Sequence, residues 1–267
     1  MNHRFCALLI MIALVLTITA CGAKTVASGD CGENVTWTLD ESGKLTISAA
    51  KPGSKMDDYS LLKLPPWAAY RGSITSVVIT GNVSYIGEGA FYQNFAAVEN
   101  IQISEGVSSI GKAAFFGCTE LKDVSLPSSL TSLGNVVFGD CTSLKSVTIP
   151  NSLATLSEGT FFECASLESV KLPDNMTTIG NAAFMDCTAL KSITLPPNTT
   201  VIEDFAFAGC TALQTIEIPA SVVTIADSAL YDCTDLKDVY FGGTREQWQA
   251  FDVYFSGALS QADIHIQ

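Results

Sequence analysis

Apolar and polar positions repeat along most of the chain with a fixed period of 23 residues. The pattern is clearest around six cysteines, each of which lies three residues after a phenylalanine or leucine and three residues before a leucine. These cysteines are Cys118, Cys141, Cys164, Cys187, Cys210 and Cys233. A period of this length is the signature of stacked structural repeats. The sequence therefore predicts a repeat solenoid.

One unit, residues 144–164, shows the elements that each repeat is expected to form. Residues 147–149 alternate between apolar and polar side chains, which predicts a strand with one buried face. Pro150 ends this strand, because proline cannot donate a hydrogen bond to a sheet ladder. A second extended stretch follows, with Leu153 and Leu156 inward. Apolar residues three to four apart then predict a short helical turn.

A single unit is too small to bury its own apolar side chains, so the units must stack. Stacking in register would place phenylalanine on phenylalanine and cysteine on cysteine, forming one continuous core. Residues 90–94 look like a further copy that lacks the cysteine, as expected of a terminal repeat. We predict about seven units in residues 74–241, mostly β with short helical turns.

The ladder of cysteines is interpreted as a row of buried thiols. Neighbouring strands lie about 4.7–4.9 Å apart, whereas a disulfide requires Cβ atoms separated by about 3.8 Å. Free cysteine also behaves as a small apolar side chain. Disulfides remain the alternative, because an even number of cysteines in an exported protein favours them. Metal binding is a third interpretation, although a row of cysteines is not a tetrahedral cluster.

The first twenty residues differ from the rest of the chain. Arg4 precedes an apolar stretch, residues 5–18, that is too short to span a bilayer and is typical of a secretory signal. The stretch ends at residues 18–22, Ile-Thr-Ala-Cys-Gly, which resembles the lipobox of bacterial lipoproteins. The resemblance implies that residues 1–20 are removed and that Cys21 carries acyl chains. The alternative is an ordinary signal peptide and a freely secreted protein.

The repeat itself resembles that of BspA-like leucine-rich-repeat surface proteins. Its form is Leu-x-x-Val-x-Leu-Pro-x-x-Leu-x-x-Ile-Gly-x-x-Ala-Phe-x-x-Cys, and copies run from about residue 74 to residue 241. The resemblance implies a leucine-rich-repeat superhelix of 23-residue units, capped at both ends. It also implies export to the cell surface, where some members of the family resemble adhesins for host matrix proteins or for other cells.

Both flanks of the repeats read as caps. Residues 32–47 contain two alternating stretches separated by Asp-Glu-Ser-Gly, which predicts a β-hairpin. We assign residues 21–73 to an N-terminal β cap and linker, and residues 242–267 to a C-terminal cap. The three tryptophans, Trp37, Trp67 and Trp248, are expected to pack within these caps. Stacking against carbohydrate is the alternative for them.

Composition and motifs give little support for catalysis. The formal net charge of −13 disfavours binding to nucleic acid, and 48% hydrophobic residues permit a packed core. Once residues 1–20 are removed, His265 is the only histidine, and phosphate-binding or calcium-binding loops are missing from the sequence. We therefore predict no catalytic residues, no metal and no cofactor. A carboxylate-pair enzyme acting on glycans is the remaining enzymatic alternative.

The surface left for function is the exposed face of the strand ladder, because solenoid curvature makes it an extended binding surface. Its central column is Gln102, Ser125, Thr148, Lys171, Thr194, Glu217 and Tyr240. Beside it lie Lys122, Lys145, Glu168, Lys191 and Lys237. We expect this face to bind a protein or glycan on a host or neighbouring cell, weakly or multivalently, because Tyr240 is its only large anchor. The alternatives are a solvated face and a structural envelope protein without a specific ligand.

Overall fold

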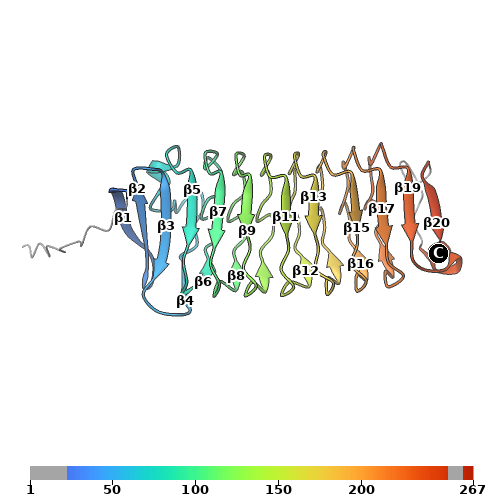
Figure 1. The fold of residues 1–267 in the computed structure, drawn as a ribbon, viewed down its shortest axis with the longest axis horizontal. Helices are drawn as coiled ribbons and strands as arrows, with labels where there is room; N and C mark the ends of the chain where they lie inside the picture. Colours follow the sequence, from blue (N-terminus) through green and yellow to red (C-terminus); the bar gives the residue numbers. More distant parts are fainter. Residues whose placement is uncertain (1–22, 252–260, 267) are drawn as a thin grey trace, which may run out of the picture.

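The computed structural model describes residues 23–251 and 261–266, so the predicted signal segment and Cys21 lie outside the described residues. The chain winds into a solenoid in which each coil adds one strand to a long parallel ladder (Figure 1). The repeat strands of this ladder are β5 (Ser76–Ile79), β7 (Asn100–Ile103), β9 (Asp123–Ser125), β11 (Ser146–Thr148), β13 (Ser169–Lys171), β15 (Ser192–Thr194), β17 (Thr215–Ile218) and β19 (Asp238–Phe241). The predicted repeat solenoid is confirmed.

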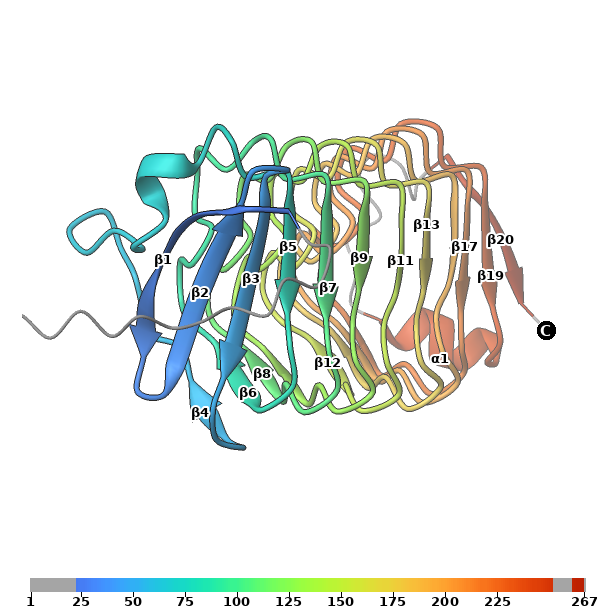
Figure 2. The same cartoon turned by 60° about the vertical axis from the view of Figure 1, so that its left-hand side comes forward.

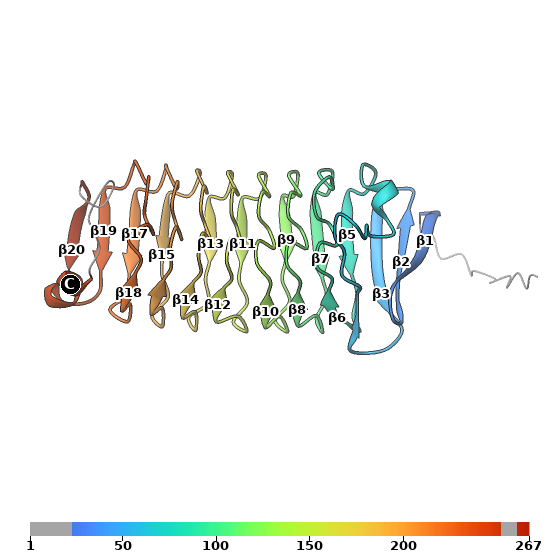
Figure 3. The same ribbon diagram turned by 180° about the vertical axis from the view of Figure 1, so that it is seen from behind.

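A second ladder of shorter strands runs along the same solenoid, as the view from behind shows (Figure 3). It consists of β4 (Ser54–Lys55), β6 (Val83–Ile86), β8 (Ser109–Ile110), β10 (Ser132–Leu133), β12 (Thr155–Leu156), β14 (Thr178–Ile179), β16 (Val201–Ile202) and β18 (Thr224–Ile225). The strands pair in parallel within two blocks, β4 to β10 and β12 to β18, and Thr155, Thr178, Val201 and Thr224 occupy one register position of the second block. These strands are the second extended stretch of each unit.

The predicted helical turn is replaced by a series of tight turns. The amide of Phe162 donates to the carbonyl of Gly159, and that of Cys164 donates to Phe161, so the hydrogen bonds span three residues rather than four. Glu163 has a left-handed backbone with φ of 57°, which interrupts any helix. Its amide donates instead to Met185 of the next coil at 2.8 Å. Bonding between coils therefore takes the place of bonding along a helix.

The core is organised around a stack of phenylalanine rings. Successive rings lie 5.3–5.8 Å apart between centroids, with their planes 5–14° from parallel. The stack comprises Phe91, Phe115, Phe138, Phe161, Phe184 and Phe207, all fully buried. Trp67 continues it toward the N-terminal cap at 5.4 Å from Phe91, and Leu230 occupies the next position after Phe207. Each coil thus covers the apolar face of its neighbour.

The cysteines that the structure describes are free and buried, as the sequence favours. The thiol of Cys164 donates to the backbone oxygen of Phe138 in the preceding coil at 3.1 Å, and the same bond recurs along the ladder. Burial raises the pKa of Cys164 to about 12. These thiols therefore stay protonated, and each donates a hydrogen bond to a buried backbone carbonyl oxygen of the preceding coil.

The N-terminal cap extends the main ladder with antiparallel strands. The predicted hairpin is present as β2 (Val35–Asp40) and β3 (Lys44–Ala49), and β3 pairs in parallel with β5. An additional strand, β1 (Thr25–Gly32), pairs antiparallel with β2. The short 3₁₀ helix η1 (Ala68–Tyr70) follows Trp67, whose ring meets that of Trp37 edge to face at 6.0 Å. These tryptophans pack within the cap.

At the other end, helix α1 (Arg245–Ala250) and strand β20 (Asp263–Ile266) close the solenoid. Thr244 caps the helix and exchanges two hydrogen bonds with Gln247, the reciprocal capping-box arrangement. Trp248 packs 5.3 Å from Phe241. Strand β20 adds in parallel to β19, so the main ladder continues one strand beyond the last repeat. No helix among the described residues is long and apolar enough to cross a membrane.

Candidate binding face

All twelve residues of the predicted face are solvent-exposed and lie along one side of the main ladder. The central column is continuous where the register is regular: Thr194 lies beside Glu217, and Glu217 lies beside Tyr240. Gln102 lies beside Ser125 and Thr148 beside Lys171 in the same way. The pairing is interrupted between β9 and β11 and between β13 and β15, so the column comprises three hydrogen-bonded blocks.

Positive charge in the repeats gathers on this face. Residues 74–267 carry seven basic and 21 acidic side chains, a net charge of −14. Five of those seven basic residues are Lys122, Lys145, Lys171, Lys191 and Lys237, which all belong to the predicted face. The twelve residues of the face include five lysines and two glutamates, so they carry a net charge of +3 on an otherwise acidic solenoid. A partner carrying negative charge is therefore repelled less here than elsewhere.

The lysines differ in their pairing. The amino group of Lys122 lies 3.0 Å from the carboxylate of Glu99 one coil earlier, an exposed ion pair. No ion pair joins Lys145, Lys171 or Lys191 to another of the described residues. Glu168 lies one coil from both Lys145 and Lys191 in the neighbouring column without pairing to either. These three ammonium groups are therefore available to an incoming ligand.

The C-terminal end of the face has a different character. The ring of Tyr240 stacks on that of His265 with centroids 4.5 Å apart and planes 15° from parallel. Nε2 of His265 lies 2.7 Å from the carboxylate of Asp238. Sequence reasoning placed His265 in the C-terminal cap and missed this contact, because the 23-residue period does not reach it. The alternation Asp-Ile-His-Ile in residues 263–266 matches Asp-Val-Tyr-Phe in residues 238–241 and could have revealed it.

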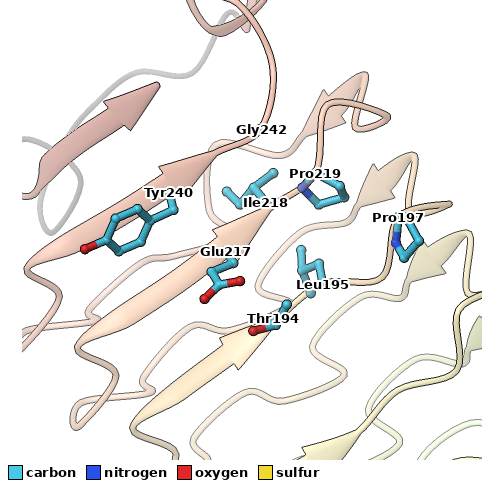
Figure 4. Close-up of a pocket in the computed structure, with 8 residues that line it drawn as sticks. All are labelled: Thr194, Leu195, Pro197, Glu217, Ile218, Pro219, Tyr240 and Gly242. Atoms are coloured by element: carbon cyan, nitrogen blue, oxygen red, sulfur yellow. The ribbon is translucent and has the colours of Figure 1, made fainter. Parts of the chain in front are cut away.

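A shallow pocket of about 370 Å³ opens beside Tyr240 (Figure 4). Tyr240, Glu217 and Thr194 lie in a row along its strand side. Its remaining lining is Leu195, Pro197, Ile218, Pro219 and Gly242. A second hollow, lined in part by Glu168 and Lys171, shares Thr194, Leu195 and Pro197 with the first. The two form adjoining depressions where the strands end at proline, a contribution of the prolines that sequence reasoning did not foresee.

The two adjoining depressions, called the groove from here on, present side chains that are suited to binding a ligand. An aromatic face, a carboxylate and a hydroxyl are presented from three successive strands over buried Leu195 and Ile218. Such a combination offers stacking, charge pairing and hydrogen bonding at fixed spacing. Among residues 23–251 and 261–266, no group of His, Cys, Asp or Glu side chains is arranged to hold a metal ion.

The turns carry a separate acidic row. Burial raises the pKa of Glu163, and the neighbouring carboxylates of Asp140 and Asp186 raise it further. All three residues have left-handed backbone conformations, with φ between 55° and 60°. They occupy equivalent positions 23 residues apart, so they belong to the repeat rather than to one concentrated site.

The parallel ladder, the 23-residue coil and the exposed strand face define a leucine-rich-repeat scaffold. The family model described as the BspA type leucine rich repeat region matches residues 68–191 and 154–265, in six copies. The chain belongs to this family. None of the curated proteins matches it in sequence.

Two solved structures of leucine-rich-repeat proteins share this fold with TM-scores above 0.5. A leucine-rich repeat protein from Bacteroides ovatus is 27% identical, with a TM-score of 0.57 over 88% of this chain and 76% of that one. The T. pallidum leucine rich repeat protein is 23% identical, with a TM-score of 0.54 over 84% of this chain and 97% of that one. A leucine rich cell surface protein from Faecalibacterium prausnitzii is 20% identical, with a TM-score of 0.38 over 86% and 97%. The second of these establishes likeness of fold alone.

Proposed function

We propose that this protein is a cell-surface lipoprotein that binds a macromolecular partner through the exposed face of its main strand ladder. The observation that carries the proposal is that five of the six basic residues of the repeats, residues 74–241, lie on that face of a strongly acidic solenoid. Random placement of solubilising lysines would distribute them around the coil. A partner with an acidic or hydroxyl-rich surface fits this arrangement best.

The groove beside Tyr240 would supply the more specific contacts. Aromatic side chains dominate binding at many protein interfaces, and Tyr240 is 41% exposed with Glu217 next to it. The lysines toward the middle of the ladder would steer the partner, and the groove would orient it. Because one groove provides most of the specific contacts, we expect a single copy of the protein to bind its partner weakly. Several copies on one cell surface should bind more strongly.

The proposal also places the solenoid outside the cell, held by acyl chains on Cys21. The support is the apolar segment of residues 5–18 followed by the lipobox-like residues 18–22. One acyl chain gives only marginal binding to a membrane, so the anchor requires the full modification. Expression in a host that processes lipoproteins, beside a Cys21→Ala variant, would test this by intact mass and by partition into detergent or membrane.

The binding role is tested first with immobilised extracellular-matrix proteins and glycans. Any selected ligand is then measured against the triple variant Lys145→Ala, Lys171→Ala, Lys191→Ala. The matched control removes three positive charges elsewhere, through Lys51→Ala, Lys112→Ala and Arg245→Ala. We expect the face variant to weaken binding at least tenfold and to lower its dependence on salt, whereas the control stays within about twofold. An equal loss of affinity in the two variants would show that the strand face is not the binding site.

A further inference from the structure

The N-terminal cap carries a group of exposed leucines that the binding face does not use. Leu61, Leu62 and Leu64 are 73%, 100% and 60% exposed. They lie in the loop of residues 60–64, which stands out from the solenoid just before η1 (Figure 2). Only eight large apolar side chains are exposed among the described residues, and three of them fall within this five-residue loop. Exposed apolar groups that cluster in this way mark contact sites.

The loop is held in shape by hydrogen bonds. The amide of Ser60 donates to the carbonyl of Lys63 at 2.9 Å, and the amide of Lys63 donates back at 3.2 Å. The hydroxyl of Ser60 also accepts from the amides of Leu62 and Lys63. Lys63 pairs with Asp57 at 3.3 Å and lies over the ring of Tyr59. Leu61 and Leu62 therefore sit at the tip of an ordered turn, where their exposure is a fixed feature.

The base of this loop is tied to the first strand of the solenoid. The hydroxyl of Tyr59 donates to the carbonyl of Cys31 in β1 at 3.2 Å, and the amide of Asp57 donates to the same oxygen at 2.8 Å. Cys21 precedes the start of β1 at Thr25 by four residues, a span of at most about 14 Å when fully extended. An acyl chain on Cys21 would therefore hold this end of the solenoid next to a bilayer.

The distribution of charge favours the same orientation. Residues 23–73 contain six basic and six acidic side chains, so the cap has no net charge, whereas residues 74–267 carry −14. An anionic membrane repels the repeats and leaves the cap as the end that can approach. Neutral charge and exposed leucines thus coincide at the end nearest the proposed anchor.

We propose that the Leu61–Leu62 tip inserts into the lipid surface as a second membrane contact that fixes the solenoid's orientation. The inference rests on the proposed lipid anchor, because that anchor sets which end faces the bilayer. Together the two contacts would leave the strand ladder projecting from the membrane, with its binding face open along its length. A single acyl anchor would leave the solenoid free to tilt against the surface.

The test supplies its own tether, so that it does not depend on natural lipidation. A chain starting at Gly22 with six histidines ahead of it is held on anionic vesicles that contain a nickel-chelating lipid. An environment-sensitive fluorophore is attached at Leu62→Cys or at Val223→Cys. Val223 is the matched control, because it is 71% exposed and lies beside β18 near the opposite end of the solenoid. The buried ladder cysteines are expected to stay unlabelled.

We expect the label at position 62 to brighten, shift to shorter wavelength and be quenched by brominated lipids, while the label at position 223 remains aqueous. In the untethered chain, Leu61→Ser with Leu62→Ser should lower vesicle partition at least tenfold, and Val223→Ser should not. An aqueous label at position 62 on tethered protein would overturn the inference even if Cys21 proves to be lipidated. If Cys21 proves not to be lipidated but the label at position 62 inserts, the proposed acyl anchor is wrong and the membrane contact of the loop is retained.

Discussion

The thiol of Cys187 donates a hydrogen bond to the backbone carbonyl oxygen of Phe161, one coil earlier, at an Sγ–O distance of 3.2 Å. The side chain of Phe161 meanwhile stacks on Phe184 at 5.6 Å between ring centroids. One coil is therefore joined to the next by a polar bond from the cysteine and by an apolar contact from the phenylalanine. The sequence repeats both residues together because both act across the same boundary between coils.

Removing one thiol should weaken that boundary. Cys187→Ala deletes a buried donor and leaves a small cavity beside Phe161, and we expect the free energy of unfolding to fall by about 1–3 kcal/mol. A guanidinium titration followed by circular dichroism measures the change. Ser192→Ala, an exposed change on the strand face, should stay within about 0.5 kcal/mol. Equal losses for the two variants would contradict the role assigned to the thiol.

The ladder thiols should be unreactive while the protein is folded. Burial raises the pKa values of Cys118, Cys164 and Cys233 to about 12, so their reactive thiolate forms are nearly absent at pH 8. For a chain that starts at Gly22, we expect a thiol-titrating disulfide reagent to detect none of the seven cysteines in buffer and all seven in guanidinium. Recovery of fewer than seven after unfolding without reductant would reveal disulfides.

The phenylalanine stack should tolerate leucine better than alanine. Phe161→Ala opens a cavity between two stacked rings and should cost about 3–5 kcal/mol. Phe161→Leu should cost less than half as much, because Leu230 fills the equivalent position in the last repeat and is buried there. Thermal unfolding of the two variants makes the comparison. A larger loss from leucine than from alanine would contradict stacking as the main contribution of this position.

Glu163 should make stability depend on pH. Its pKa is raised in the folded protein, so its favourable contribution is present below the ordinary value of 4.5 and is lost as pH rises through the folded value. We expect Glu163→Gln to be more stable than the parent at pH 7 by less than about 1 kcal/mol, since the carboxylate is largely solvated. The difference should vanish near pH 3.

Unfolding curves at pH 3, 5 and 7 check this, with Glu168→Gln as the control. Glu168 is also exposed, but it lies on the strand face away from Asp140 and Asp186. A constant difference between Glu163→Gln and the parent across the three pH values would show that neither burial nor the carboxylates of Asp140 and Asp186 make stability depend on the ionisation of Glu163.

The 23-residue period was enough to predict the solenoid coil, but not the hydrogen bonding of its turns or strand β1. The spacing of Val147, Leu153 and Phe161 fixed the coil, because stacking requires equivalent residues at equal intervals. The helical turn was predicted wrongly, since apolar spacing of three to four residues also arises from successive turns whose amides bond between coils. Strand β1 could not be predicted, because its sequence shows little alternation of apolar and polar residues. It forms because the edge of β2 is open to pairing.

The candidate face was predictable only in part. Its columns follow directly from the 23-residue period, and all twelve chosen side chains are exposed. The stack of His265 on Tyr240 depends on β20 adding after a segment that does not repeat, so it required three-dimensional information. The exposure of the leucines in residues 60–64 could not be predicted from the sequence either, because it depends on the path of the loop away from the cap.

Binding through the strand face can be tested by blocking that face with a bulky group. Thr148→Cys on β11 and Thr155→Cys on β12 are both exposed, seven residues apart, and lie on the two different ladders. Each is coupled to polyethylene glycol, and binding to the matrix protein or glycan selected from the immobilised panel is measured. We expect the polymer at position 148 to abolish binding and the polymer at position 155 to leave it nearly unchanged. Unchanged binding with the polymer at position 148, or failure of the panel to select any ligand over background, would show that the strand face is not a binding surface.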